Sequence, residues 1–529
     1  MKPADAFQPP EAQGLRRRAV RGAGVTVLSQ SLGFAVQMIA TVVLARLLAP
    51  DDFGLVAMVT TFSLLLMNCG FNGFTEAVIQ RDTVDHVLLT NVFWINAGVG
   101  LVLTIGFAAA GPLLARFYGD PRVARVAVAL SVTILFTTLS VQHLALLKRS
   151  MRFSVVSANE IVARTASVIV SIVLAWAGWG YWALVAGTVS IPLSTAVGAW
   201  IMCPWIPGLP RRGADTGKMI RFAVNTYGRF AANYCTWNLD NLLVGWRFGP
   251  QSLGFYKKAY DLFVLPANQL CHPLTVVAVS ALSRVTGDAA QYRRYFLRAL
   301  STMAFIGMGL GASLTLIGKD LILVLLGPGW ETSGRIFTFF GPGIGIMLLY
   351  NTHGWVHLSI GRADRWLRWG IVELTVTGLC FLVGLSWGPV GIALAWVVSY
   401  WILTIPGLWY AGKPINLQVG PMIGVVWRYV LASALGAIAS TLVVREFPSV
   451  LAASGVTGAL ARIAVNTSLF GVFYLAAVIL LHKGCEPLWR IAELLREMVP
   501  SSRVHQGRAV VVAASRGERL ATPAAADGV

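Results

Sequence analysis

Long apolar stretches follow one another along almost the whole chain, and short polar turns separate them. A helix needs about 20 apolar residues to cross a hydrocarbon core of about 30 Å. Fourteen stretches reach this length, and each predicts one membrane-spanning helix: 22–47, 53–75, 86–115, 123–147, 154–177, 181–203, 219–247, 255–282, 296–326, 334–360, 366–387, 389–411, 423–444 and 459–482. The pattern therefore predicts an all-α integral membrane protein.

The composition supports this fold class. Hydrophobic residues make up 56% of the 529 residues and charged residues only 12%, whereas soluble domains carry about 25% charged residues. There is too little charge to cover the surfaces of soluble domains. The six cysteines form no C-x-x-C pair, and five lie in apolar stretches, so we interpret them as small hydrophobic residues and not as disulfides or metal ligands.

The basic residues set the expected orientation. The net charge is +19, but the Lys and Arg residues form short clusters between apolar stretches and no single patch, so nucleic acid is not an expected partner. If the N-terminus lies in the cytoplasm, most of the 42 Lys and Arg residues fall on cytoplasmic loops and ends. This asymmetry predicts that both termini are cytoplasmic.

Two sequence echoes indicate an internal duplication. Pro50 and Gly54, between the first two stretches, reappear as Pro250 and Gly254 between the seventh and eighth. A second echo relates 178–184 to 388–394. We expect two pseudo-symmetric six-helix lobes with two extra C-terminal helices, and parallel repeats of this kind place a binding site between the halves.

The predicted parts of the chain follow from these boundaries. They are a cytoplasmic N-terminal segment (1–21), a first lobe (22–203), a cytoplasmic linker (204–218), a second lobe (219–411), two further spans (412–483), and a cytoplasmic interfacial helix with a disordered tail (484–529).

Polar residues form stripes on several predicted spans, and these stripes define a candidate site. Polar side chains in a membrane usually face a cavity or a partner. The candidate cavity residues are Arg229, Asn233, Trp237, Asp240 and Arg247 on 219–247, Asp261 and His272 on 255–282, and Gln30, Gln37 and Arg46 on 22–47. The structural alternative for each is a hydrogen bond that holds helices together, and for Arg46 and Arg247 snorkelling to the interface. For the stripe on 219–247 as a whole we favour a hydrated, partly cationic cavity, in which Arg229 is the best candidate for binding phosphate.

Other polar residues suggest structural roles. Glu160 precedes Arg164 by four residues, the favourable order for a helical ion pair. His353 and His357 share one helix face without a third metal ligand nearby, so we expect aromatic packing, with proton transfer as the alternative. The chain contains no Walker motif. We expect no metal and no cofactor, and a proton or other ion gradient remains the candidate driving force.

Several short motifs resemble those of the polysaccharide transporter, or O-antigen flippase, family of the multidrug/oligosaccharidyl-lipid/polysaccharide exporter superfamily. They lie, in order, at 45–48, 53–56, 77–80, 93–96, 152–153, 183–185, 240–245, 253–256, 280–284 and 361–362. Each is weak alone, but their order and spacing make the match specific over roughly 22–411.

The resemblance implies a function. It implies flipping of a polyprenyl-diphosphate-linked oligosaccharide across the bacterial inner membrane by alternating access, with membrane lipid, a polymerase and export machinery as candidate partners. The polyprenyl tail would stay in lipid between the lobes. This chain departs from the family at Trp237 and Trp246, where basic residues are common, so the expected phosphate contact moves to Arg229 and Arg247.

Three other functions compete with this one. A multidrug antiporter of the same superfamily would favour an acidic cavity for cationic drugs. A membrane-embedded glycosyltransferase or polymerase would need a catalytic domain, but the longest connector is 204–218 and no Asp-x-Asp occurs, so we do not expect an enzyme. A structural scaffold does not explain a duplicated bundle.

Overall fold

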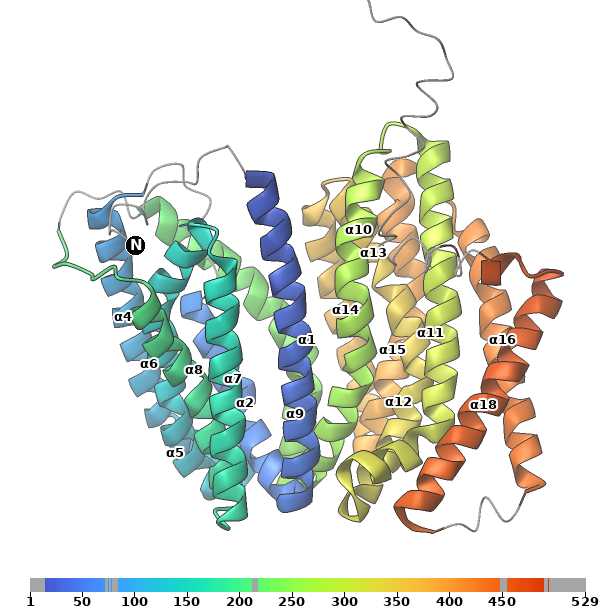
Figure 1. The fold of residues 1–529 in the computed structure, drawn as a ribbon, viewed down its shortest axis with the longest axis horizontal. Helices are drawn as coiled ribbons and strands as arrows, with labels where there is room; N and C mark the ends of the chain where they lie inside the picture. Colours follow the sequence, from blue (N-terminus) through green and yellow to red (C-terminus); the bar gives the residue numbers. More distant parts are fainter. Residues whose placement is uncertain are drawn as a thin grey trace, which may run out of the picture.

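The structure is a computed structural model that describes residues 15–71, 75, 78, 84–211, 217–447, 454–489 and 493, with the side chains of most of them. Helices form all the regular secondary structure in this part of the chain (Figure 1). The helices of the first half are α1 (Leu15–Leu47), α2 (Pro50–Phe71), α4 (His86–Ala109), α5 (Gly111–Tyr118), α6 (Arg122–Arg149), α7 (Phe153–Trp176) and α8 (Tyr181–Met202).

The second half continues with one very long helix and a series of shorter ones. These are α9 (Gly217–Pro266), the π-helical η2 (Ala267–Cys271), α10 (His272–Ser283), α11 (Ala289–Leu326), η3 (Pro328–Trp330), α12 (Glu331–Tyr350), α13 (Thr352–Ser359), α14 (Ala363–Gly384), η4 (Leu385–Trp387), α15 (Gly388–Gly412), η5 (Lys413–Ile415), α16 (Val419–Arg445) and α18 (Gly455–His482). The predicted segment 1–21 and the predicted terminal helix and tail lie largely outside the described residues.

The predicted spans map onto these helices. Eleven helical segments among the described residues are long and apolar enough to cross a membrane. Two of them, Tyr234–Ser283 and Asp364–Ile415, are 50 and 52 residues long and each covers two predicted spans. The predicted span 334–360 corresponds to α12 followed by α13. The all-α, multi-span membrane fold is therefore confirmed.

Local sequence signals set several helix ends. Asp85 caps the start of α4, where its Oδ1 accepts the Leu88 N–H at 2.8 Å, because the first N–H groups of a helix lack partners within it. Gly119 ends α5 in a left-handed conformation with φ 71°, which glycine adopts without steric cost. The next helix then turns back alongside α4.

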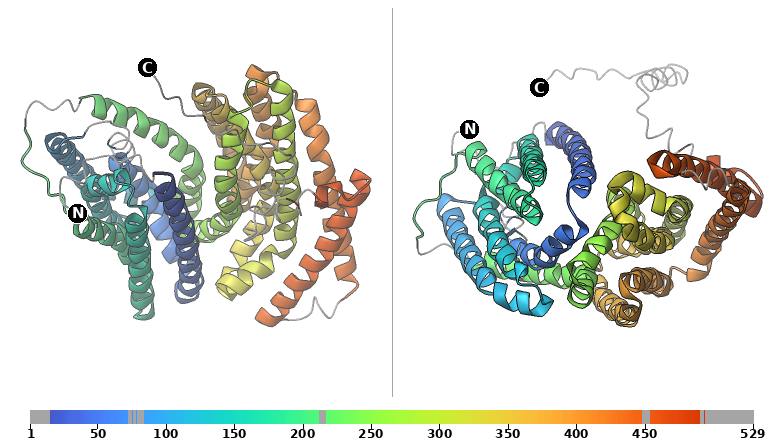
Figure 2. Two further views of the ribbon diagram at one scale, coloured as in Figure 1. Left: turned by 45° about the horizontal axis from the view of Figure 1, so that its top comes forward. Right: turned by 90° about the horizontal axis from the view of Figure 1, so that it is seen from below.

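Helix α9 connects the two halves of the molecule. It runs past α2 and continues into the second half, as two views show (Figures 1 and 2). The hydroxyl of Tyr227 donates to the Leu65 carbonyl at 3.1 Å, and that of Tyr234 donates to the Thr61 carbonyl at 3.0 Å. The helix is interrupted at Gly249, where φ is 78° and ψ is 180°. The first part of α9 is thus attached to α2, and the helix bends at Gly249 before its second part packs among the other helices of the second half.

The last two long helices pack beside α11 at the far side of the second half (Figure 2). Arg462 of α18 donates to Asp320 of α11, with an Nη2 to Oδ1 distance of 2.6 Å, and both side chains are 17% exposed. Further along, the Tyr474 hydroxyl donates to the Phe305 carbonyl at 2.7 Å. These contacts join the C-terminal helix pair to the main bundle.

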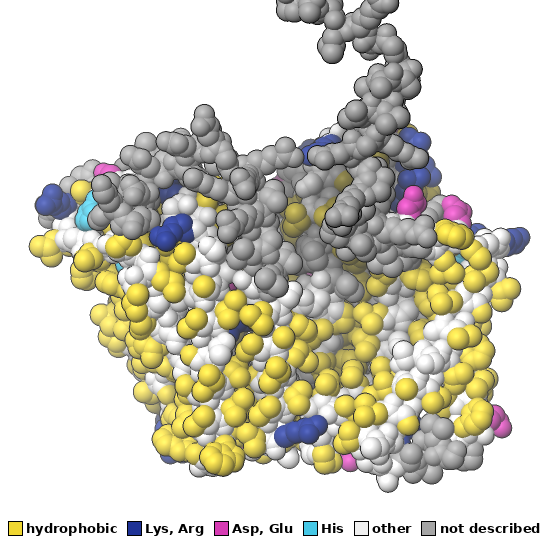
Figure 3. All heavy atoms as spheres, in the orientation of Figure 1, with side chains coloured by type: hydrophobic (Ala, Val, Ile, Leu, Met, Phe, Trp, Pro, Cys, Tyr) yellow, Lys and Arg dark blue, Asp and Glu magenta, His cyan; other side chains and the backbone are white. Residues whose placement is uncertain are grey.

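The outer surface has the composition of a membrane protein. Hydrophobic side chains cover the middle of the visible face, and Lys and Arg gather toward its two ends (Figure 3). Large apolar residues on several helices are open to the surroundings, among them Val102 at 69%, Ile201 at 77% and Leu480 at 75% exposure. Such exposure is unfavourable in water and favourable in lipid, so the helices present their apolar faces to a bilayer.

Candidate substrate site

The two halves of the chain contact each other through the two related turns. Gly54, in the first turn of α2, lies against the carbonyl of Pro250, and Gly254 lies against the carbonyl of Pro50. A Cβ atom at either glycine would overlap the opposing backbone. Each turn therefore needs its glycine because the other turn occupies the space of a side chain.

Two side chains extend this contact, which we call the lobe contact and define by Arg46, Pro50, Gly54, Pro250, Gly254 and Trp330. Arg46 Nη2 donates to the Val324 carbonyl at 2.9 Å, and Trp330 Nε1 donates to the Ala45 carbonyl at 2.8 Å. Val324 lies in the last turn of α11, where carbonyl groups have no partner within the helix and a cation is favourable. Arg46, a predicted cavity residue, thus binds the end of a helix in the other half.

Aromatic rings fill the remaining space at the lobe contact. The Phe53 and Trp330 rings meet edge to face with centroids 5.4 Å apart, and Lys258 Nζ lies 4.1 Å from the centroid of the Phe53 ring. Lys258 was not among the predicted site residues. Its cation and the ring come from different halves, so this attraction exists only while the halves are together.

Three predicted cavity residues have side chains outside the described part of the structure. Arg229 and Asn233 belong to the first part of α9, and His272 is the first residue of α10. Their roles remain predictions.

The structure places five other predicted residues at accessible positions. Trp237 is 49% exposed on α9, and Arg247 is exposed just before the Gly249 bend, 5.8 Å from the Phe248 ring centroid. Asp261 is exposed and forms an ion pair with Lys257 one helical turn earlier. Gln30 and Gln37 are both exposed on α1. These side chains are available to a ligand, and their contact with substrate remains a prediction.

Asp240 does not line a cavity, contrary to the prediction. Its side chain is fully buried. Oδ2 accepts the Tyr256 hydroxyl at 2.7 Å and the Trp396 Nε1–H at 2.9 Å, and Oδ1 accepts the Asn241 N–H at 2.7 Å. Three donors, two from α9 itself and one from α15, therefore satisfy this carboxyl group inside the second half.

The predicted ion pair between Glu160 and Arg164 is absent. Both side chains are exposed on α7, and no ion pair joins these two described residues. The Arg164 side chain extends across to α1 instead, where its Cδ lies next to Gly33. The missing side chain of Gly33 gives Arg164 room to follow the neighbouring helix, and this draws its guanidinium away from Glu160.

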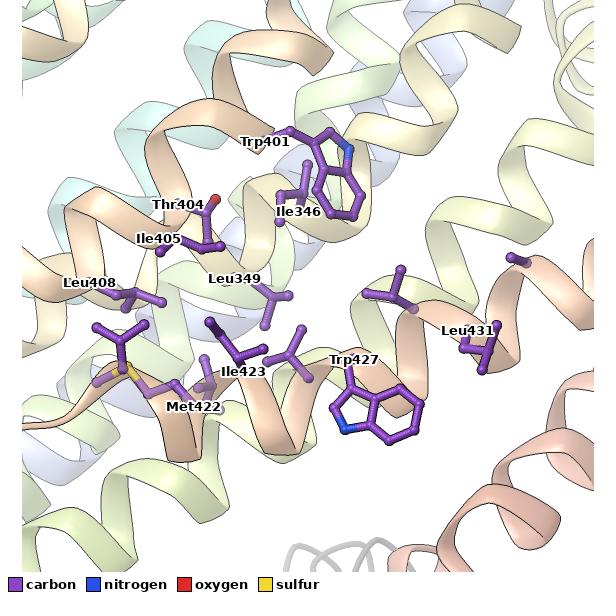
Figure 4. Close-up of a pocket in the computed structure, with 15 residues that line it drawn as sticks. Ile346, Leu349, Trp401, Thr404, Ile405, Leu408, Met422, Ile423, Trp427 and Leu431 are labelled. Atoms are coloured by element: carbon purple, nitrogen blue, oxygen red, sulfur yellow. The ribbon is translucent and has the colours of Figure 1, made fainter.

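A separate apolar cleft lies between α15 and α16 (Figure 4). Its volume is about 390 Å³, and its lining includes one hydroxyl group, that of Thr404. The lining residues are Leu300, Ile346, Leu349, Trp401, Thr404, Ile405, Leu408, Val419, Met422, Ile423, Val426, Trp427, Val430, Leu431 and Ala434. The cleft suits hydrocarbon, because its lining contains no cation for a diphosphate and only one hydroxyl group for a sugar.

Glu373, like Lys258, was not among the predicted site residues. This carboxyl group lies in the middle of α14, with ten helical residues before it and eleven after it, and it faces the Tyr350 hydroxyl. A lone acidic residue inside an apolar stretch is a functional signal, and that signal was available in the sequence.

The fold defines the class of protein, a multi-span bundle of membrane helices. A solved structure of the lipid II flippase MurJ in an inward closed conformation matches 86% of this chain and 98% of its own, with a TM-score of 0.68 at 14% identity. An inward-facing multidrug resistance transporter of the MATE family matches 74% of this chain and 98% of its own, with a TM-score of 0.58 at 12% identity. At these identities the likeness shows the fold alone.

The family follows from the sequence match. The family described as "Polysaccharide biosynthesis protein" matches residues 43–334, more than half of the chain. The chain therefore belongs to this polysaccharide biosynthesis family, and the resemblance found in its motifs is confirmed.

Characterised relatives carry consistent names. The succinoglycan biosynthesis transport protein ExoT of Rhizobium meliloti is 20% identical over 500 residues, which cover 94% of this chain and 98% of the relative. The lipopolysaccharide biosynthesis protein WzxC of Escherichia coli is 22% identical, with 76% of this chain and 82% of the relative covered. The teichuronic acid biosynthesis protein TuaB of Bacillus subtilis is 23% identical over 72% of this chain and 79% of its own.

Proposed function

We propose that this protein moves a polyprenyl-diphosphate-linked oligosaccharide across the bacterial cytoplasmic membrane by alternating access. The observation that carries the proposal is membership of the polysaccharide biosynthesis family in a chain whose two halves meet through reciprocal turns. Related halves that tilt about a shared contact can expose a site between them to each side in turn.

The chemistry of the accessible groups supports this cargo. Arg247 and the predicted Arg229 supply cations for the diphosphate, and Trp237 offers a ring on which a sugar can stack. The apolar cleft and the lipid-facing surface accept hydrocarbon. In this proposal the chain acts as a transporter and not as an enzyme, because each of these features binds a part of the cargo.

The orientation is part of the proposal. The distribution of Lys and Arg supports cytoplasmic positions for both termini, and in this orientation the lobe contact would lie at the periplasmic end. A reporter fused within 449–454 should be periplasmic, and one fused after Arg212 should be cytoplasmic. The reverse result at either position contradicts this orientation.

A deletion strain tests the function directly. We expect lipid-linked repeat units to accumulate on the cytoplasmic face and drug tolerance to stay unchanged. Unchanged lipid-linked pools with altered drug tolerance would instead support a multidrug antiporter; the structural neighbour of the MATE family is described as a multidrug resistance transporter.

Arg229→Ala in the complementing gene tests the phosphate contact. We expect Arg229→Ala to lower export without loss of the protein from the membrane. Arg229→Lys should retain part of the export because the positive charge remains. Normal export by Arg229→Ala would contradict a role for Arg229 in binding phosphate.

A further inference from the structure

Asp240 and Glu373 are two carboxyl groups of the second half that lie within predicted spans and form no ion pair among the described residues, and they differ in how many hydrogen bonds they accept. Asp240 is fully buried and accepts three hydrogen bonds. Glu373 is only partly buried, and one donor group, the Tyr350 hydroxyl, faces it. A carboxylate with a single donor in a membrane interior is costly to keep charged, and a partly open position allows a proton to reach it.

The Tyr350 hydroxyl is oriented by a hydrogen bond from Trp369. Trp369 Nε1 donates to the Tyr350 oxygen at 2.8 Å, so the indole occupies an acceptor site of the hydroxyl and leaves the hydroxyl proton available to Glu373. Tyr350 and Trp369 are 3% and 6% exposed and pack with Leu403. The position of the hydroxyl is therefore fixed by packing as well as by hydrogen bonding.

No cation neutralises Glu373 within the described structure. The ion pairs found there involve Arg122, Lys257, Arg368 and Arg462, and none includes Glu373. Several titratable groups lie around Glu373 or around the residues next to it. They are Tyr350 on α12, His353 and His357 on α13, Asp364 and Arg365 at the start of α14, Tyr400 and Tyr410 on α15, and, beyond Tyr400, Asp240 on α9.

The two histidines extend from this group toward the end of α13. The His353 ring lies 4.4 Å from the Tyr350 ring, and the His357 ring lies 5.9 Å from that of His353. His353 Nε2 and both ring nitrogens of His357 have no hydrogen-bond partner among the described residues. The side chains of Glu373, Tyr350, His353 and His357 thus form a row. This row ends near Asp364 and Arg365, at the start of α14.

From this arrangement we propose that Glu373 is a proton-binding residue of the transport cycle, with His353 and His357 on the route of the proton. Glu373 takes up one proton on one side of the membrane and releases it on the other, and no other bond is made or broken. Movement of the cargo is thereby coupled to the proton gradient. This coupling rests on the proposed transport function, whereas proton binding by Glu373 does not.

Infrared difference spectroscopy of the purified full chain in lipid tests proton binding without any cargo. We expect a carbonyl band of a protonated carboxylic acid that appears as the pH is lowered. Glu373→Gln should lose this band. Asp364→Asn is the matched control, since Asp364 is on the same helix and its side chain is 52% exposed, and it should keep the band. A band retained in Glu373→Gln would overturn the proposal.

A second variant covers the case in which Glu373→Gln does not accumulate. Tyr350→Phe removes the hydroxyl and keeps the ring, so the band should remain but titrate around a different pH. An unchanged titration would overturn the assignment of the band to Glu373.

Coupling is tested in inverted membrane vesicles with lipid-linked oligosaccharide extracted from the deletion strain. Wild type should move this lipid faster under a pH gradient, and Glu373→Gln should lose the stimulation. Equal stimulation of both proteins would overturn the coupling. Failure of wild type to move the lipid at all would contradict the proposed function and leave the infrared result to decide proton binding.

Discussion

Gly54 and Gly254 occupy equivalent positions in the two related turns, and each lies against the proline carbonyl that begins the other's helix. The relationship is reciprocal, as a twofold relation between the halves requires. It explains why the Pro and Gly spacing occurs twice in the sequence, since each copy is the binding surface of the other.

Replacing either glycine should separate the halves. A methyl group at Gly54 or Gly254 would overlap backbone atoms, which cannot rotate away, so Gly54→Ala should destabilise the protein by about 2 kcal/mol. The measurement is the thermal unfolding midpoint in detergent, together with the amount of protein in the membrane. Gly98→Ala is the control, because Gly98 lies within α4 with open space around it, and it should be neutral or stabilising by about 0.5 kcal/mol. Equal midpoints for Gly54→Ala and Gly98→Ala would contradict the contact.

Asp240→Ala should be strongly destabilising. The substitution leaves the Tyr256 hydroxyl and the Trp396 indole N–H without their acceptor in a buried site, at a cost of about 3 kcal/mol. Asp240→Asn keeps an acceptor oxygen, so its free energy of unfolding should fall by less than that of Asp240→Ala. Thermal unfolding of the three proteins compares these costs, and a wild-type midpoint for Asp240→Ala would show that the carboxyl group is not sealed in this network.

The ion pair between Asp320 and Arg462 should stabilise the packing of α18 on α11. Removal of one partner leaves the other charge half-buried, so Arg462→Met alone should cost about 2 kcal/mol. The double variant Asp320→Leu with Arg462→Met removes both charges and should recover part of that loss. A double-mutant cycle measures the coupling, and strictly additive effects would mean that the pair contributes nothing.

Acid should weaken the junction of α2 with α6. Arg122 binds Asp51 at 2.7 Å and Asp120 at 2.8 Å, and the hydrogen bond from Arg122 lowers the pKa of Asp120 below its ordinary value of 3.8. A lowered carboxyl pKa contributes stability that is present above the unfolded pKa and is lost as the pH falls through the folded pKa.

Asp120→Asn should therefore lower stability at neutral pH and make it less dependent on pH below about 4. Unfolding midpoints measured between neutral and acidic pH compare the two proteins. Parallel curves for Asp120→Asn and wild type would show that Asp120 does not titrate in the way described.

The length of the apolar stretches was enough to predict the helices, because a bilayer fixes how many residues a span needs. The side of the helix on which each residue of 219–247 lies was also predictable, since helical rotation is regular. What that side of the helix contacts was not predictable. Asp240 is bound by Trp396, which lies 156 residues later, and nothing in the local pattern distinguishes a polar side chain that meets water from one that meets an indole on another helix.

The same limit applies to Glu160 and Arg164. Their spacing satisfies the rule for a pair within one helix, but Gly33 on a different helix offers Arg164 another position. The Arg46 contact with Val324 was likewise unpredictable, because it depends on where α11 ends next to α1.

The bend at Gly249 divides α9 into two arms and lies next to the lobe contact. Tyr227 and Tyr234 fasten one arm of α9 to α2, the other arm enters the second half, and the reciprocal glycines lie just beyond the bend. A tilt of the two halves about the Gly249 bend, as the proposed function requires, would leave the lobe contact almost unmoved and would displace the helix ends at the opposite membrane face most. In such a cycle the lobe contact would hold one end together while the other end opens.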